Sequence, residues 1–205
     1  MLRCNVLLTI KQKRKEDHMA HEEEILTIME SLKIADKHTV GDIMASKGIW
    51  NAGTSAVNNT YKALNALVDL GKLEKGNGYF RVKGCRSEYK GHAQELTKAL
   101  AEILKLNHKN HILREVEIKE VGLRSDAIVL MLKGDELLCF VLEVANNETE
   151  EYLKQKVNAW VLWEDAEKKL SELFGTKVEQ FDIVVKGMDG AGDFDFEEYV
   201  GFLDE

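Results

Sequence analysis

The sequence predicts a two-domain protein of mixed α+β type, with a small helical domain closed by a β-hairpin and a larger α/β domain. Two patterns predict it. Apolar residues recur at helical spacing up to residue 70 and then alternate around a Gly-Asn-Gly turn, whereas after residue 88 a helix and three strands precede a helix and a last strand. The joint is expected at residues 84–88, where a turn-rich stretch precedes a long amphipathic helix.

Three short helices are expected in the first domain. Residues 22–33 place apolar side chains at i, i+3, i+4 and i+7, which predicts a helix with one buried face. Thr39 is expected to cap a second helix. Thr54 or Ser55 is expected to cap a third helix, which Gly71 ends.

A β-hairpin follows the third helix. Residues 72–75 and 79–82 alternate on either side of the Gly-Asn-Gly turn, which is a hairpin signal. Three short helices and a hairpin within residues 22–84 predict a winged helix-turn-helix domain. The segment ALVDLGKLEKGNGYFRV resembles the end of the recognition helix and the wing of winged-helix DNA-binding domains.

Polar and basic side chains on this domain predict contact with double-stranded DNA. Helix-turn-helix domains place the N-terminal half of the third helix in the major groove, where Asn, Ser and Thr can bond to base edges. Basic residues of the wing suit phosphates. The residues expected to contact DNA are Thr54, Ser55, Asn58, Asn59 and Lys62 on the helix, and Lys72, Lys75, Arg81 and Lys83 on the hairpin.

The net charge of −8 is unevenly distributed along the chain. Residues 1–21 carry five basic and two acidic side chains, and residues 22–84 carry eight of each. Residues 85–205 carry fifteen basic and twenty-six acidic side chains. This distribution excludes a protein that coats nucleic acid through bulk charge, so DNA contact is expected from a local patch in the first 84 residues.

Several protein classes are excluded. No stretch approaches the ~20 apolar residues of a membrane span, and the first short apolar run is followed by basic residues, unlike a secretory signal. Cys4, Cys85 and Cys139 are far apart, which predicts a reducing cytoplasm without disulfides or structural zinc. Two histidine pairs, His18 with His21 and His108 with His111, are three residues apart, but no cysteine or third histidine lies at metal-ligand spacing. His92 is expected to cap or pack at a helix start.

The second domain is expected to wrap a small sheet with helices in the order α-β-β-β-α-β. The expected elements are a helix at residues 92–106, strands at residues 112–121, 125–132 and 137–144, a long helix from about residue 148 to 174, and a strand at residues 181–185.

Two acidic residues of this domain form a candidate metal site. Asp126 begins one expected strand and Glu143 ends the next, and a turn makes these strands antiparallel neighbours, so both carboxylates are expected at one sheet edge. Such a pair suits Mg²⁺, which can polarise a phosphodiester and activate water. The alternative is a structural ion pair between Arg124 and either carboxylate.

This layout resembles the PD-(D/E)xK nuclease superfamily, which has a restriction-endonuclease-like fold, over residues 88–188. Asp126 matches the family's Asp, and Glu143 matches its Glu. Ala145 stands where the family has lysine, which counts against nuclease activity.

Some members of the superfamily carry the lysine on the following helix, where Lys154 or Lys156 could reach back. Glu95 matches an extra acidic residue that some members have on the preceding helix. The resemblance therefore implies a Mg²⁺-dependent nuclease with Asp126, Glu143 and Lys156 as its catalytic residues.

A narrower resemblance covers about residues 22–185. The winged helix followed by HAQEL, LRSDAIV and FVLEVANNETEEYLKQKVNAW is similar to the replication-relaxation family of plasmid and phage proteins. The matching residues are Arg124, Asp126, Ala127, Glu143, Lys156 and Trp160, with Ser125 in place of the family's proline and Ala145 in place of its second acidic residue. This resemblance implies DNA binding without a defined catalytic activity.

The leading functional prediction is a cytoplasmic protein that binds double-stranded DNA in replication or maintenance of a plasmid, phage or other mobile element. One alternative is the nuclease, with Mg²⁺ as its cofactor. The other is a winged-helix transcriptional regulator whose acidic C-terminal domain forms a homodimer or binds a protein partner. A basic segment at residues 1–21 and an acidic tail at residues 189–205 flank the two domains.

Overall fold

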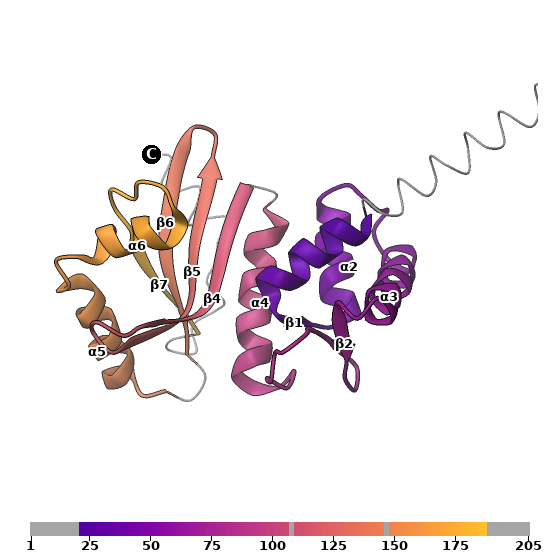
Figure 1. Cartoon of the computed structure of the whole chain (residues 1–205), viewed down its shortest axis with the longest axis horizontal. Coiled ribbons are helices and arrows are strands. Elements are labelled where there is room, and N and C mark those ends of the chain that lie inside the picture. The colour runs from indigo at the N-terminus through magenta and orange to yellow at the C-terminus, as the bar shows by residue number, and fades with distance from the viewer. Residues whose placement is uncertain (1–20, 107–108, 146–147, 188–205) are drawn as a thin grey trace, which may run out of the picture. The chain divides into compact units, whose positions relative to one another are not determined.

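The structure, a computed structural model, describes residues 21–106, 109–145 and 148–187. It is a mixed α+β protein with two sheets, and the chain divides into two compact units between Tyr89 and Lys90 (Figure 1). Only His21 of the predicted basic segment is described, and the predicted acidic tail lies outside the described residues. None of the described helices is both long and apolar enough to cross a lipid bilayer.

The first element that the structure describes in the first unit is a helix at residues 21–32. Its other elements are β1 (Ile34–Ala35), α2 (Lys37–Ser46), α3 (Thr54–Asp69), β2 (Leu73–Lys75) and β3 (Phe80–Val82). The predicted hairpin is confirmed, because β2 and β3 pair antiparallel. The sequence did not predict β1, which pairs with β3 and completes a sheet in the order β1-β3-β2, because two residues are too few to show alternation.

Asp36 caps α2, so the prediction of Thr39 as the cap was wrong. Asp36 Oδ1 accepts hydrogen bonds from the backbone N–H groups of His38 (2.7 Å) and Thr39 (3.0 Å). Its Oδ2 accepts from the hydroxyls of Thr39 (2.9 Å) and Tyr89 (2.7 Å). Burial opposes ionisation of Asp36, but these hydrogen bonds hold the pKa of its carboxyl below the usual value. The capping carboxylate therefore ties the start of α2 to the end of the unit.

The predicted cap of α3 was also wrong. Gly53 occupies the N-cap position with a φ of 89°, a left-handed conformation that favours glycine, and no side chain caps the helix. Thr54 is the first helical residue, and Thr54 and Ser55 are exposed. The opposite face of α3 is buried, through Ala56, Thr60, Ala63, Leu64 and Leu67.

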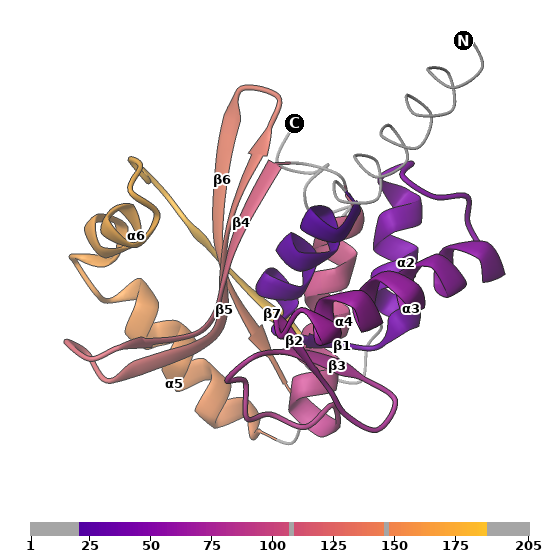
Figure 2. The same cartoon turned by 45° about the vertical axis from the view of Figure 1, so that its right-hand side comes forward.

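The second unit is a four-stranded sheet with α4 on one face and α5 and α6 on the other (Figure 2). Its elements are α4 (Gly91–Lys105), β4 (Lys109–Ile118), β5 (Leu123–Lys133), β6 (Glu136–Val144), α5 (Glu150–Val161), α6 (Ala166–Phe174) and β7 (Asp182–Lys186). The strand order is β4-β5-β6-β7, with the first three antiparallel and β7 parallel to β6.

The prediction of one long helix after β6 was wrong, because α5 and α6 are separate. Trp160 and Leu170 both pack into the apolar cluster beneath these helices. In one straight helix their side chains would point about 80° apart, since ten residues make about 2.8 turns. A turn, in which the N–H of Trp163 bonds to the carbonyl of Trp160 at 3.3 Å, reorients the chain. Both side chains then face the sheet.

Apolar side chains fill both faces of the sheet. On one face, β4, β5 and β6 pack against α5 and α6 through a buried cluster of Ile118, Leu123, Ile128, Leu130, Cys139, Val141, Trp160, Ala166, Leu170 and Val178. On the other face α4 is fully buried at Leu96, Ala99, Leu100 and Ile103. Both helical layers therefore hold the sheet in place.

Two fully buried threonines differ in their hydrogen bonding, and one substitution is expected to affect them in opposite ways. Thr60 Oγ1 on α3 has no partner among the described residues, whereas Thr97 Oγ1 on α4 donates to the Ala93 carbonyl (2.8 Å) and accepts from Arg114 (3.0 Å). Thr60→Val removes an unsatisfied hydroxyl and is expected to raise the free energy of unfolding by about 1 kcal/mol.

Thr97→Val, the control, deprives Arg114 of an acceptor and is expected to lower the free energy of unfolding by about 1–3 kcal/mol. Urea unfolding followed by circular dichroism measures both variants. A loss of stability on Thr60→Val would contradict the assignment of an unsatisfied hydroxyl.

Candidate functional site

Strands β5 and β6 separate where the two predicted carboxylates lie. They pair as far as Ala127 opposite Leu142. Beyond this point β5 continues beside β4, whereas β6 stays beside β7. Asp126 and Glu143 are the next residues on their strands, so the structure places them at the fork between β5 and β6.

Strand β4 turns over beside this fork. Arg114 bonds to α4 on one face of the sheet, whereas Val116 packs against the α5–α6 cluster on the other face. Residues two apart on a regular strand share a face, so the strand turns over between them. Glu115 has a φ of 54°, in the left-handed region. The register of β4 and β5 places Asp126 beside Glu115, at the point where the side chains of β4 change from one face of the sheet to the other.

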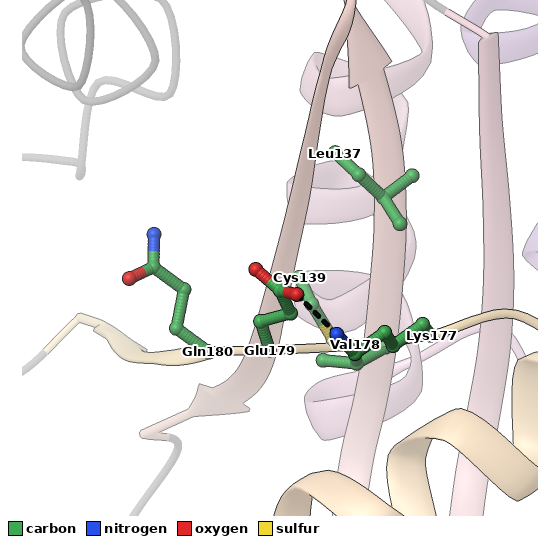
Figure 3. Close-up of a pocket in the computed structure, with 6 residues that line it drawn as sticks. All are labelled: Leu137, Cys139, Lys177, Val178, Glu179 and Gln180. Carbon is green, nitrogen blue, oxygen red and sulfur yellow. Dashed lines mark hydrogen bonds and ion pairs between the residues drawn. The ribbon is translucent and has the colours of Figure 1, made fainter.

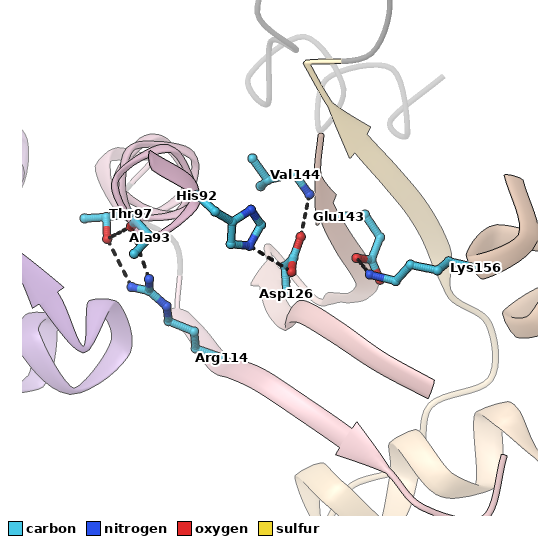
Figure 4. A network of polar contacts seen from close by, with 8 residues as sticks. All are labelled: His92, Ala93, Thr97, Arg114, Asp126, Glu143, Val144 and Lys156. Carbon is cyan, nitrogen blue, oxygen red and sulfur yellow. Dashed lines mark hydrogen bonds and ion pairs between the residues drawn. The ribbon is translucent and has the colours of Figure 1, made fainter. Parts of the chain in front are cut away.

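The Asp126 carboxylate is held by one partner on each oxygen (Figure 4). Oδ2 accepts the backbone N–H of Val144 at 2.8 Å, and Oδ1 lies 3.0 Å from Nε2 of His92. Burial opposes ionisation of Asp126, but these hydrogen bonds hold the pKa of its carboxyl below the usual value. Asp126 is therefore ionised at neutral pH.

Glu143 lies against Lys156, which extends from α5 to the fork. The Lys156 ammonium donates directly to Glu143 Oε2, and only 1% of the Glu143 side chain and 14% of the Lys156 side chain are exposed. One turn further along α5, Trp160 donates its indole N–H to Ser125 Oγ at 2.9 Å. The structure thus brings together Asp126, Glu143 and Lys156, the three predicted catalytic residues.

The pKa values of the Asp126 and Glu143 carboxyl groups shift in opposite directions. Burial raises the pKa of Glu143 to about 7; Lys156 opposes this rise and the charge of Asp126 adds to it. Neighbouring carboxyl groups with opposite pKa shifts are typical of sites where one group holds a proton near neutral pH and the other does not.

The oxygen donors at the fork fit Mg²⁺. Glu143 Oε1 is buried and accepts no hydrogen bond among the described residues, so it has an unused acceptor site. The described part of the chain holds no group of three or more His, Cys, Asp or Glu side chains suited to a metal ion. Two carboxylates, with water or substrate oxygens in the other positions, suit Mg²⁺, whereas a zinc site uses three or four protein ligands.

His92 is a site residue whose role the sequence did not predict. It was expected to cap or pack, but it bonds to Asp126. Glu95, the expected acidic residue of this helix, instead pairs with Lys98 at 2.9 Å and is 45% exposed. Arg124 is exposed and, within the described residues, bonds to neither carboxylate. The signal in the sequence that could have indicated this role of His92 was its position three residues before Glu95, on the same helix.

The residues predicted to contact DNA from α3 share one exposed surface. Their side chains make no hydrogen bond or ion pair within the described structure, so they are free to bind a partner. These residues are Thr54, Ser55, Asn58, Asn59 and Lys62.

The predicted hairpin residues differ in how firmly they are held. Lys72 is exposed. Lys75 donates to the Tyr61 hydroxyl at 3.0 Å and to Asn65 Oδ1 at 2.9 Å. Arg81 pairs with Glu74 across the hairpin at 2.9 Å, so its charge is already compensated within the sheet.

A cavity of about 400 Å³ lies at the other end of β6 (Figure 3). Leu137 and Cys139 of β6 line it together with residues 177–180. Burial raises the pKa of the Cys139 thiol to about 12, which makes it a poor nucleophile. Lys177 and Glu179 pair with each other at 2.5 Å. The fork, with its opposed pKa shifts, is the better candidate for chemistry.

No protein-family model, curated protein or solved structure matches the chain.

The buried pair at the fork predicts a large penalty when one partner is removed. Lys156→Met leaves Glu143 buried without its cation, and we expect the free energy of unfolding at pH 8 to fall by about 3–5 kcal/mol. Replacing both residues, as in Glu143→Leu with Lys156→Met, is expected to recover most of this loss. Urea unfolding measures the free energy of unfolding of the unmodified protein, the single variant and the double variant.

The matched control is Lys98→Met, which breaks the exposed pair with Glu95. It is expected to change stability by less than about 1 kcal/mol. Equal effects of the Lys156 and Lys98 substitutions would contradict a buried, paired Lys156.

Proposed function

We propose that this chain binds double-stranded DNA and acts in replication or maintenance of a plasmid, phage or other mobile element. The observation that carries the proposal is the unpartnered polar surface on the N-terminal half of α3. The order helix, β1, α2, α3, β2, β3 supports the proposal of a winged helix-turn-helix domain, in which this half of the third helix enters the major groove.

The chemistry of this surface suits base edges. Asn58 and Asn59 each offer an amide that can bond bidentately to adenine, and Thr54 and Ser55 offer hydroxyls. Lys62 and Lys72 supply positive charge for phosphates. Because residues 22–84 are neutral overall, binding rests on these local groups rather than on net charge.

A second function, a Mg²⁺-dependent DNA nuclease, is favoured by the assembly of Asp126, Glu143 and Lys156 at the fork. Lys156 supplies from α5 an ammonium that Ala145, the residue just after β6, lacks. Mg²⁺ bound to the two carboxylates would supply Lewis acidity and activate a water molecule. Asp126 and Glu143 would hold the cation, and Lys156 would hold Glu143 in place and present positive charge to a phosphate.

DNA binding predicts a difference between two asparagine substitutions on α3. Asn58→Ala with Asn59→Ala removes the amides of the exposed surface and is expected to weaken binding by about 30-fold or more, because each base contact contributes about 1–3 kcal/mol. Asn65→Ala, the control, removes an amide that is occupied by Tyr61 and Lys75, and is expected to have little effect. Fluorescence anisotropy on a duplex selected from a random pool by the unmodified protein measures both.

Salt dependence tests the phosphate contacts in the same assay. Lys72→Ala is expected to lower the slope of log affinity against log salt by about one. Failure to select or bind any duplex would contradict the proposed function.

The nuclease function predicts metal-dependent nicking of supercoiled plasmid. Nicking is expected with Mg²⁺ or Mn²⁺, and its loss is expected with EDTA or on Asp126→Ala with Glu143→Ala. Glu95→Ala, the control, removes an exposed carboxylate of α4 and is expected to keep the activity. Plasmid that is shifted but uncut, equally by the unmodified and the doubly substituted protein, would leave DNA binding alone.

A further inference from the structure

We propose that His92 is a positioning residue that fixes the Asp126 carboxylate for binding of a divalent cation. The inference rests on the proposed metal-dependent function of the second unit. It goes beyond that function because it assigns a role to a residue outside the three predicted catalytic positions.

His92 is one of two groups that hold the Asp126 carboxylate. Asp126 Oδ1 lies 3.0 Å from His92 Nε2, and Oδ2 accepts the Val144 N–H at 2.8 Å. One contact comes from α4 and the other from β6, so both carboxylate oxygens are held from outside β5 (Figure 4). With one oxygen held, the carboxylate could still turn about its Cβ–Cγ bond; with both held, its plane is fixed.

The position of His92 is itself fixed by the fold. It is the second residue of α4, and the Arg114 guanidinium donates to the carbonyl of the next residue, Ala93, at 3.2 Å and to the Thr97 hydroxyl at 3.0 Å. Lys186 of β7 donates to Glu102 of α4 at 2.5 Å. The first turn of α4 is therefore anchored to β4, and the helix is also tied to β7.

The ring of His92 has one polar partner at the site. Its Nδ1 is buried and has no hydrogen-bond partner among the described residues. The hydrogen bond at Nε2 therefore favours the form that carries a proton on Nε2 and donates it to Asp126. A donor that contacts a metal-binding carboxylate and orients it is expected to contribute 10–100-fold to metal affinity, as such outer contacts usually do.

The test is a titration of Mn²⁺ into the full chain without DNA, with free Mn²⁺ measured by electron paramagnetic resonance. We expect the unmodified protein to bind Mn²⁺, and Asp126→Ala with Glu143→Ala to abolish this binding. His92→Ala is expected to weaken it about 10–100-fold. His92→Gln can donate from its amide to Asp126 and is expected to recover most of the affinity, which a purely structural role would not predict.

His111→Ala is the matched control, because His111 is an exposed histidine of β4 in the same unit. It is expected to leave Mn²⁺ affinity unchanged, and circular dichroism establishes that each variant is folded. Equal or tighter Mn²⁺ binding by folded His92→Ala would overturn the role of His92 while leaving the metal site standing. Absence of Mn²⁺ binding by the unmodified protein would overturn the proposed metal-dependent function, and the inference with it.

Discussion

The second unit depends on the separation of β5 from β6 at Asp126 and Glu143. Where the strands part, the Val144 N–H bonds to the Asp126 carboxylate in place of a strand partner. A buried N–H without a partner costs about 1–3 kcal/mol, so the carboxylate also completes the backbone hydrogen bonding. The left-handed Glu115 on β4 lies beside this point, where that strand turns over. The fold therefore sets its two carboxylates at an irregular part of the sheet, where side chains from both helical layers reach them.

Each carboxylate at the fork has a nitrogen partner from a different layer. His92 contacts Asp126 from α4, and Lys156 contacts Glu143 from α5. Buried ion pairs are weak contributors to stability compared with apolar residues of similar volume. Stability alone therefore does not explain a lysine and a glutamate in such a position.

The sequence predicted the parts of this fold that depend on periodicity and on strand pairing. The hairpin after α3 followed from alternation, and the proximity of Asp126 and Glu143 followed from the antiparallel pairing of their strands. The sequence did not predict features that depend on the contacts of a single side chain. Asp36 outcompetes Thr39 as a cap because its carboxylate satisfies two backbone N–H groups at once. The hydrogen bond between His92 and Asp126 spans 34 residues and follows from how α4 packs on the sheet, which no local pattern encodes.

The ammonium that contacts Glu143 comes from a helix and not from the strand that carries Glu143. Ala145, two residues after Glu143 and just beyond the end of β6, has no charged side chain. Here α5 supplies the ammonium, and the bond from Trp160 to Ser125 ties this helix to β5 one turn beyond Lys156. Residues 85–205 carry an excess of acidic side chains, so DNA is not drawn to this half of the chain by net charge. If the fork acts on DNA, the α3 surface of the first unit has to bring the substrate, and DNA binding and cleavage then depend on different units of one chain.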